Sequence, residues 1–193
     1  MALPLAAPER QLRHRRRIDV QIYARGQGLW EVDAQLDDVK TRDVQMRAGV
    51  RRAGEPIHDM RLRIVVDERF NILEAGAETV AMPYPAACDT HGDAYARLVG
   101  LNLLDGFRRN VAERLGGVLG CTHLSELTWV LPTSVVQAFA GEGLLGRIGA
   151  DGEPARPFQI DRCHALRADG PVVQTQYPRW YRAPIPSDAI ETP

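Results

Sequence analysis

Two pairs of alternating segments in the first half of the chain restrict its fold more than any other feature. Ile18, Val20 and Ile22 alternate with polar residues, and a second alternating run covers residues 30–36. A period of two residues is typical of a β-strand with one buried face. Residues 25–28 contain the two glycines that a tight connection needs, so the two runs are predicted to form an antiparallel hairpin.

A second hairpin is predicted immediately downstream. In residues 60–66 apolar positions alternate with arginines, and the polar residues 67–71 can turn the chain into another strand at 72–80. Alternation along all of these segments indicates a sheet with one face on the core and one in water. The two hairpins are therefore expected to join in one antiparallel sheet.

The chain changes character after residue 85, where helical spacing replaces alternation. Apolar residues from Phe107 to Leu115 recur four positions apart, which predicts a helix that Asp105 caps and two glycines end. A second helix is predicted from residue 120, and Pro132 is expected to kink or break it.

Strands that precede helices favour the α+β class, with an antiparallel sheet of N-terminal hairpins packed against C-terminal helices. Residues 158–166 and 172–177 are predicted to be late strands or an extended wrap. One domain is expected over residues 13–182, with flexible tails at 1–12 and 183–193.

Composition narrows the class of protein. The formal net charge of −1 provides no global field toward nucleic acid or anionic lipid, and neither is expected as a partner. The sequence has no apolar run of about 18 residues and no signal-like N-terminal segment, so a cytoplasmic protein is predicted. In that reducing compartment the three cysteines are expected to be free thiols or ligands and not disulfides.

Each cysteine has a histidine close by in the sequence: Cys88 with His91, Cys121 with His123, and Cys163 with His164. Thiolate and imidazole are common ligands of zinc and of iron–sulfur centres. These spacings are not diagnostic, because a free cysteine is often only a small buried side chain. By default Arg13 to Arg17 and the pair Asp37-Asp38 are expected to be solvated charges.

The segment Gly120-Cys121-Thr122-His123 carries the strongest chemical signal. Cys121 is expected at the beginning of a helix, where unpaired backbone N–H groups favour negative charge. Such a position suits a thiolate, and His123 could ligate a metal together with it or act as its base.

Two resemblances sharpen these predictions. Residues 120–124, with Leu-Val-Gly-Leu before them and His58-Asp59-Met60, resemble a bacterial family designated domain of unknown function 2889, over roughly residues 13–180. That family implies no activity. Residues 56–139 more distantly resemble the U-type iron–sulfur scaffold domain.

The scaffold resemblance implies a site for zinc or an iron–sulfur cluster. Asp59 matches the scaffold aspartate, Cys88 its second cysteine and Cys121 its third. The sequence departs from the scaffold pattern where Ile57 replaces the first cysteine, leaving His58 as the nearest substitute. It departs again where Gly120 replaces a histidine, with His123 following. Alternation also places His58 and Asp59 on opposite faces of one strand.

The sequence thus supports a metal- or iron–sulfur-binding accessory protein with ligands drawn from Cys88, Cys121, His123, His58 and Asp59. The alternative is an enzyme for acyl or thioester substrates, with Cys121 as nucleophile and His123 as base. A third interpretation is a binding protein whose cysteines are buried and inert. The partner would be another protein or a small molecule, and a homodimer could form through a sheet edge.

Overall fold

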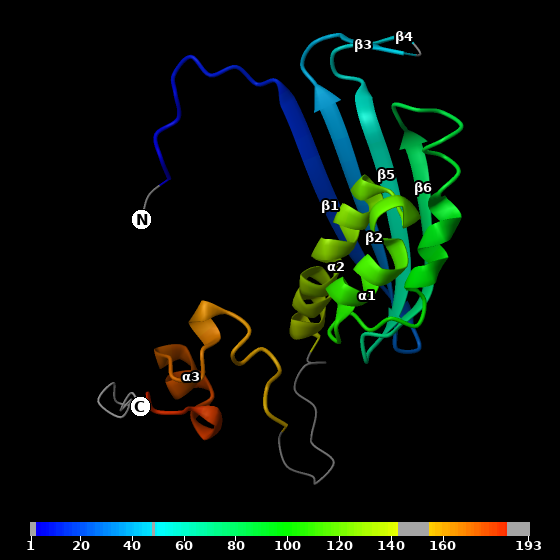
Figure 1. The fold of residues 1–193 in the computed structure, drawn as a ribbon. Helices are drawn as coiled ribbons and strands as arrows, with labels where there is room; N and C mark the ends of the chain where they lie inside the picture. Colours follow the sequence, from blue (N-terminus) through cyan, green and yellow to red (C-terminus); the bar gives the residue numbers. More distant parts are fainter. Residues whose placement is uncertain (1–2, 48, 143–154, 185–193) are drawn as a thin grey trace, which may run out of the picture. The chain divides into compact units, whose positions relative to one another are not determined.

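The structure is a computed structural model that describes residues 3–47, 49–142 and 155–184 (Figure 1). The chain divides into two compact units, Met1–Ala138 and Phe139–Pro193. This division does not test the predicted single domain over 13–182, which stays a prediction. Residues 3–12 are exposed, and residues 185–193 of the predicted C-terminal tail lie outside the described residues.

The first unit contains a four-stranded antiparallel sheet in the order β1-β2-β5-β6, which confirms both predicted hairpins. The strands are β1 His14–Gly26, β2 Leu29–Lys40, β5 Pro56–Asp67 and β6 Ile72–Ala81. A separate two-stranded sheet, β3 Val44–Met46 and β4 Gly49–Arg51, was not predicted. Gly26, Gln27 and Gly28 all have positive φ angles, of 88°, 54° and 73°, as a tight hairpin connection of this hand requires.

Helical segments follow the sheet and cover one of its faces (Figure 1). They are the 3₁₀ helix η1 Gly92–Leu98, the helix α1 Phe107–Leu115, the 3₁₀ helix η2 Gly117–Leu119 and the helix α2 Thr122–Gly141. The α+β class is therefore confirmed.

The predicted cap of the first helix was wrong. Gly106, in the left-handed conformation at φ 56°, precedes α1 as its N-cap, so Asp105 does not cap this helix. Helix α2 continues through Pro132, so the proline does not break it, and the kink stays a prediction. Buried Leu131 and Val135 on either side of this proline provide packing that offsets the lost backbone hydrogen bond.

The core of the first unit lies between the sheet and the helices. The inward face of β2 contributes Val32, Ala34 and Leu36, each at most 2% exposed, and the helices contribute buried side chains of the same kind. The buried helical side chains include Phe107, Val111, Leu115, Leu124 and Leu127. Removing one such leucine side chain costs about 2–5 kcal/mol, so this layer fixes where α2 lies on the sheet.

The second unit has its own small core of Ile160, Ala168 and Val173, against which four larger apolar side chains pack. Its regular elements are the 3₁₀ helix η3 His164–Leu166, the helix α3 Pro171–Gln176 and the 3₁₀ helix η4 Pro178–Trp180. The predicted late strands were therefore wrong. Helical turns satisfy their backbone groups locally, whereas a strand needs a partner. In the described part of the chain, no helix is long and apolar enough to cross a membrane.

Candidate functional site

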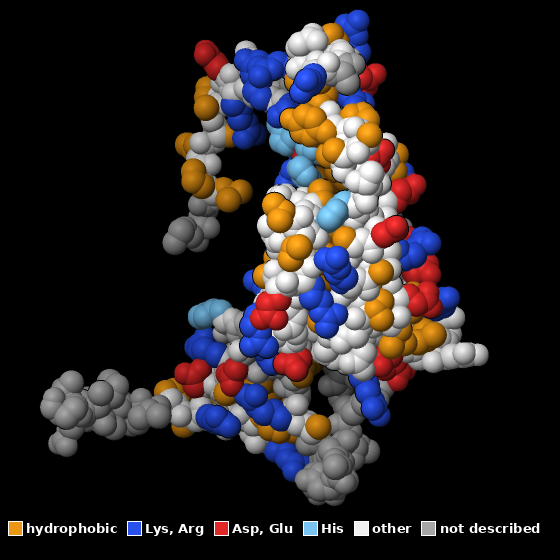
Figure 2. Space-filling model, turned by 45° about the vertical axis from the view of Figure 1, so that its right-hand side comes forward, with side chains coloured by type: hydrophobic (Ala, Val, Ile, Leu, Met, Phe, Trp, Pro, Cys, Tyr) orange, Lys and Arg blue, Asp and Glu red, His pale blue; other side chains and the backbone are white. Residues whose placement is uncertain are grey.

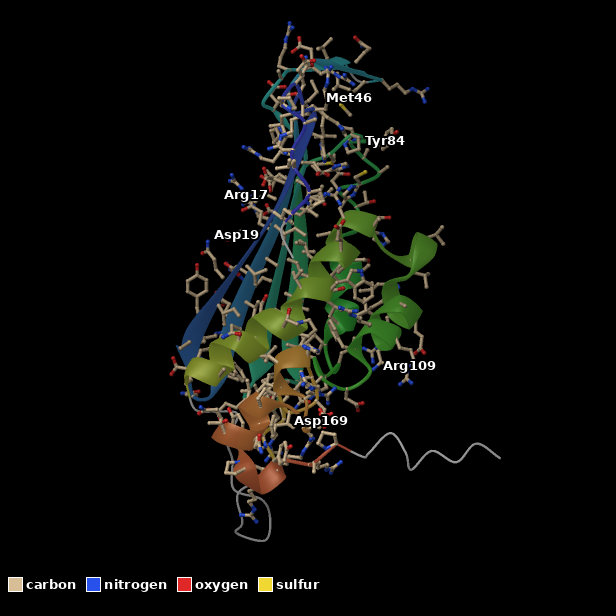
Figure 3. All side chains as sticks on the ribbon, turned by 90° about the vertical axis from the view of Figure 1, so that its left-hand side faces the viewer. Arg17, Asp19, Met46, Tyr84, Arg109 and Asp169 are labelled. Atoms are coloured by element: carbon tan, nitrogen blue, oxygen red, sulfur yellow. The ribbon has the colours of Figure 1, made fainter. Side chains whose placement is uncertain are left out.

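Three polar side chains lie side by side on the inward face of the sheet. The strand register pairs Arg16 of β1 with Asp38 of β2, and Asp38 with His58 of β5. Arg17 and Asp19 point away from the helices (Figure 3), so Arg16 points toward them because successive side chains alternate between faces. On β2 the same alternation continues the buried series of Val32, Ala34 and Leu36 to Asp38.

Asp38 is 2% exposed and accepts four contacts of 3.1 Å or less from three neighbouring side chains. Arg16 bonds both carboxylate oxygens, from Nε to Oδ1 at 2.8 Å and from Nη2 to Oδ2 at 2.7 Å. His58 Nδ1 lies 2.9 Å from Oδ2, and His14 Nε2 lies 3.1 Å from Oδ1. Since a carboxylate has about four acceptor positions, the buried charge of Asp38 is fully satisfied.

The surroundings of Asp38 fix its charge. Burial by itself would raise the pKa of this carboxyl, but hydrogen bonds from Arg16 and His58 and the positive charge of Arg16 lower its pKa to about 2. The side chain is therefore ionised at neutral pH. Arg16 is held in turn by an ion pair between its Nη1 and Glu126 of α2, which ties β1 to the helix.

His123 reaches this cluster from the first turn of α2. Its ring stacks on His58, with 3.7 Å between the ring centroids and 30° between the planes, and its Nε2 lies 3.8 Å from Asp38 Oδ2. Burial, His58 and Arg16 lower the pKa of His123, although Asp38 and Glu126 act in the opposite direction. The His123 ring is thus neutral at pH 7, as a metal ligand or a general base must be.

Tyr95 determines where α2 begins. Its side chain is fully buried, and its hydroxyl donates to the Cys121 carbonyl at 2.8 Å and accepts from the Cys121 N–H at 3.1 Å. Burial raises the pKa of Tyr95, so the phenol keeps its proton. A Cβ on Gly120 would lie 2.2 Å from the Leu115 carbonyl oxygen and 3.2 Å from the Tyr95 hydroxyl, and only glycine fits this approach.

Cys121 lies immediately before α2, as predicted, and its carbonyl accepts the Ser125 N–H at 2.8 Å. Its Sγ is 4.0 Å from His123 Nδ1. The two nitrogens of the His123 ring therefore face different groups, Nδ1 the thiol of Cys121 and Nε2 the carboxylate of Asp38. All three cysteines of the chain are free.

Asp38, His58 and His123 form a group that could hold a metal ion, because one ligand atom from each lies within 4.8 Å of the others. Four-coordinate zinc with ligand bonds of about 2.1 Å separates its ligand atoms by about 3.4 Å. The distances from Asp38 Oδ2, 2.9 Å to His58 Nδ1 and 3.8 Å to His123 Nε2, lie on either side of that value. Histidine side chains of the first unit reach the surface on the face drawn in Figure 2.

The structure brings together some of the predicted site residues. His58 and His123 stack and Cys121 lies beside His123, but this metal-binding group contains no cysteine. Asp59 lies on the outward face, where its carboxylate accepts from Gln35 Nε2 at 2.9 Å. The half-buried Cys88 is not in the group, and its role as a ligand stays a prediction.

Neither Arg16 nor Asp38 was predicted as a site residue. The expectation of a solvated charge was wrong for Asp38, which is buried, whereas Arg16 is exposed as expected but pairs with Asp38 and Glu126. The alternating pattern of β2 contained the signal for Asp38, since the buried positions at 32, 34 and 36 continue to 38. The basic cluster in β1 hid Arg16 among exposed arginines.

The fold and this cluster define an α+β protein with a buried, ionised carboxylate on the inward face of its sheet. Two stacked imidazoles, one from the sheet and one from α2, lie beside that carboxylate. A family model described as "Protein of unknown function (DUF2889)" matches residues 14–137, more than half of the 193 residues. The chain belongs to the DUF2889 family. No curated protein and no solved structure matches the chain, and the resemblance to the U-type scaffold stays a prediction.

Proposed function

We propose that this protein binds a divalent transition metal ion, zinc in the first place, through Asp38, His58 and His123. The observation that carries the proposal is the convergence of three ligand atoms within 4.8 Å around a buried carboxylate. Two imidazoles and one carboxylate suit zinc and ferrous iron. Iron–sulfur clusters are held mainly by cysteine thiolates, so this ligand group favours a single ion.

The ion would replace a proton already bound at this position. His58 Nδ1 and Asp38 Oδ2, 2.9 Å apart, share one hydrogen, and a metal bound to both atoms takes its place. Asp38 keeps its contacts with Arg16 and His14 at the remaining acceptor positions. His123 completes the set through Nε2. Three protein ligands leave one position of a tetrahedral ion open, which is the pattern of catalytic zinc sites.

Cys121 does not belong to this coordination shell. Its sulfur faces Nδ1 of His123, and the two nitrogens of an imidazole point in different directions, so a metal on Nε2 lies on the far side of the ring. With zinc on Nε2, the Nδ1–H would donate toward the sulfur, as the second nitrogen of a metal-bound histidine commonly does toward its neighbours.

The test measures metal bound to untagged full-length protein by elemental analysis and by calorimetric titration with zinc. The wild type is expected to bind one ion per chain, and His58→Ala and His123→Ala to bind at least about tenfold more weakly, since even lost outer contacts cost that much. His164→Ala, an exposed histidine of the second unit, is the matched control. Equal zinc binding by all four proteins would exclude the proposed site.

A second candidate function is favoured by the order Cys121, His123, Asp38. The thiol of Cys121 lies 4.0 Å from Nδ1 of His123, and Nε2 of His123 lies 3.8 Å from the carboxylate of Asp38. Thiol enzymes place a nucleophile, a base and an orienting carboxylate in the same order at shorter distances. This arrangement supports an acyl or thioester substrate that is attacked by Cys121.

Thiol labelling distinguishes this second candidate from metal binding. In a Cys88→Ser, Cys163→Ser background only Cys121 reacts with iodoacetamide, and a nucleophile requires labelling at least about a hundredfold faster than in the His123→Ala variant. Equal rates in the two proteins would exclude the thiol enzyme and leave metal binding unaffected.

A further inference from the structure

Arg16 has binding capacity beyond the contacts that hold it. A guanidinium carries five N–H donors, and within the described part of the chain three of its bonds are accounted for, two to Asp38 and one to Glu126. The side chain of Arg16 is 34% exposed. One hydrogen on each terminal nitrogen is thus left over at the rim of the buried carboxylate.

The position of Arg16 relates directly to the open coordination site. Its Nη2 donates to Asp38 Oδ2 at 2.7 Å, the oxygen that the ion would bind at about 2.1 Å. With ordinary angles at that oxygen, ion and Nη2 lie about 4 Å apart. One carboxylate spans this separation, with one oxygen on the ion and the other accepting the second hydrogen of Nη2.

Charge favours a monoanion at this place. A divalent ion and Arg16 together outweigh the charges of Asp38 and Glu126 by one positive unit when the histidine ligands are neutral. A carboxylate balances that single charge, whereas a dianionic phosphate exceeds it. A carboxylate and a phosphate would both be attracted to a cationic site. The carboxylate is favoured because its single negative charge matches the single positive charge of the site.

We propose that the open position of the metal ion binds the carboxylate of a small organic acid, and that this carboxylate bridges the ion and the Arg16 guanidinium. The inference rests on the metal binding proposed above. Glu126 is a positioning residue in this arrangement, because its ion pair with Nη1 fixes the rotation of the guanidinium plane. The substrate class of the site is thereby an organic acid.

The experiment loads full-length protein with cobalt(II) and follows its visible absorption while sodium acetate, acetamide or inorganic phosphate is added. Acetate is expected to change the spectrum, whereas acetamide, of the same shape without the charge, is expected to leave it unchanged. Arg16→Lys keeps the positive charge but lacks the planar guanidinium with its two terminal nitrogens. In this variant the dissociation constant for acetate is expected to rise about tenfold. Arg63→Lys, on the outward face, is the matched control.

The outcomes separate the two proposals. Cobalt bound at one per chain with a spectrum that acetate does not change overturns the carboxylate inference and leaves metal binding standing. Absence of bound cobalt overturns both. Acetamide as effective as acetate, or Arg16→Lys as good as wild type, overturns the bridging role of Arg16. Phosphate tighter than acetate overturns the choice of a monoanion. The wild-type comparison of acetate with acetamide decides even where Arg16→Lys folds poorly.

Discussion

Strand β2 carries two aspartates, and each accepts two parallel hydrogen bonds from an arginine of a neighbouring strand. The two pairs share this geometry but lie on opposite faces of the sheet, and their carboxylates differ in burial. On the inward face Asp38 pairs with Arg16, and the carboxylate side chain is 3% exposed. On the outward face Asp33 pairs with Arg63, from Nε at 2.5 Å and from Nη2 at 2.6 Å, with 34% and 61% of the two side chains exposed.

The comparison shows that surroundings, and not the pair itself, make a site. Water competes with the exposed Asp33–Arg63 pair, and exposed pairs contribute little to stability. Asp38 is cut off from water, so every acceptor position must be satisfied by the protein, and imidazoles fill what Arg16 leaves. The proposed site is therefore built on the inward pair, while the outward pair is a surface feature.

The largest expected effect is on stability. Asp38→Asn leaves the buried amide among donors that it cannot all satisfy, and we expect the free energy of unfolding to fall by about 3 kcal/mol. Asp33→Asn, the matched change on the outward face, should have a much smaller effect. Urea denaturation of the two variants measures both. Equal losses would show that burial of Asp38 has no energetic consequence.

Zinc should increase the difference in stability between Asp38→Asn and Asp33→Asn. A ligand that binds only the folded state stabilises it by about 2.7 kcal/mol at a concentration one hundred times its dissociation constant. The wild type and Asp33→Asn are therefore expected to gain stability in zinc, and Asp38→Asn to gain almost none. Thermal unfolding with and without zinc checks this, and a similar gain in Asp38→Asn would remove Asp38 from the ligand set.

Acid should weaken the inward pair specifically. The folded pKa of Asp38, about 2, lies below the ordinary value of 3.8, so its charge contributes stability that is fully present above pH 3.8 and is lost as the pH falls through 2. The contribution is at most about 2 kcal/mol. The difference in unfolding free energy between wild type and Asp38→Asn should thus shrink between pH 4 and pH 2; a constant difference would contradict the shifted pKa.

The smallest effect is expected on the outward face. The hydrogen bonds that Arg63 donates to Asp33 raise the pKa of Arg63. The pair is exposed and screened, however, so Arg63→Gln should change stability within the error of the measurement. Arg16→Gln, the matched inward change, should destabilise measurably by leaving Asp38 without its main partner. Calorimetry at low and high salt tests both: the loss in Arg16→Gln should persist at high salt, and Arg63→Gln should match the wild type at either salt concentration.

Periodicity predicted the sheet and both main helices, because buried faces repeat every two or every 3.6 residues. The side-chain chemistry of cysteine and histidine identified His58, His123 and Cys121 as candidate site residues. Asp38 was missed because the alternating run was predicted to end at residue 36 and the pair Asp37-Asp38 was expected to be solvated. The contact of His123 with Asp38 could not be predicted, since it depends on where α2 docks on the sheet. Asp59 is the opposite case: it was predicted as a candidate ligand, but the alternation of side chains places it on the outward face of the sheet.

The ion pair between Arg16 and Glu126 joins residues 110 positions apart in the sequence. Hairpins close short loops, whereas joining distant segments costs more chain entropy and slows folding. The sheet can thus form before α2 docks, and the cluster is complete only after docking. During refolding, we therefore expect the imidazoles to stack only after the sheet has formed, and a signal from Trp30 in β2 to precede one from Trp129 in α2.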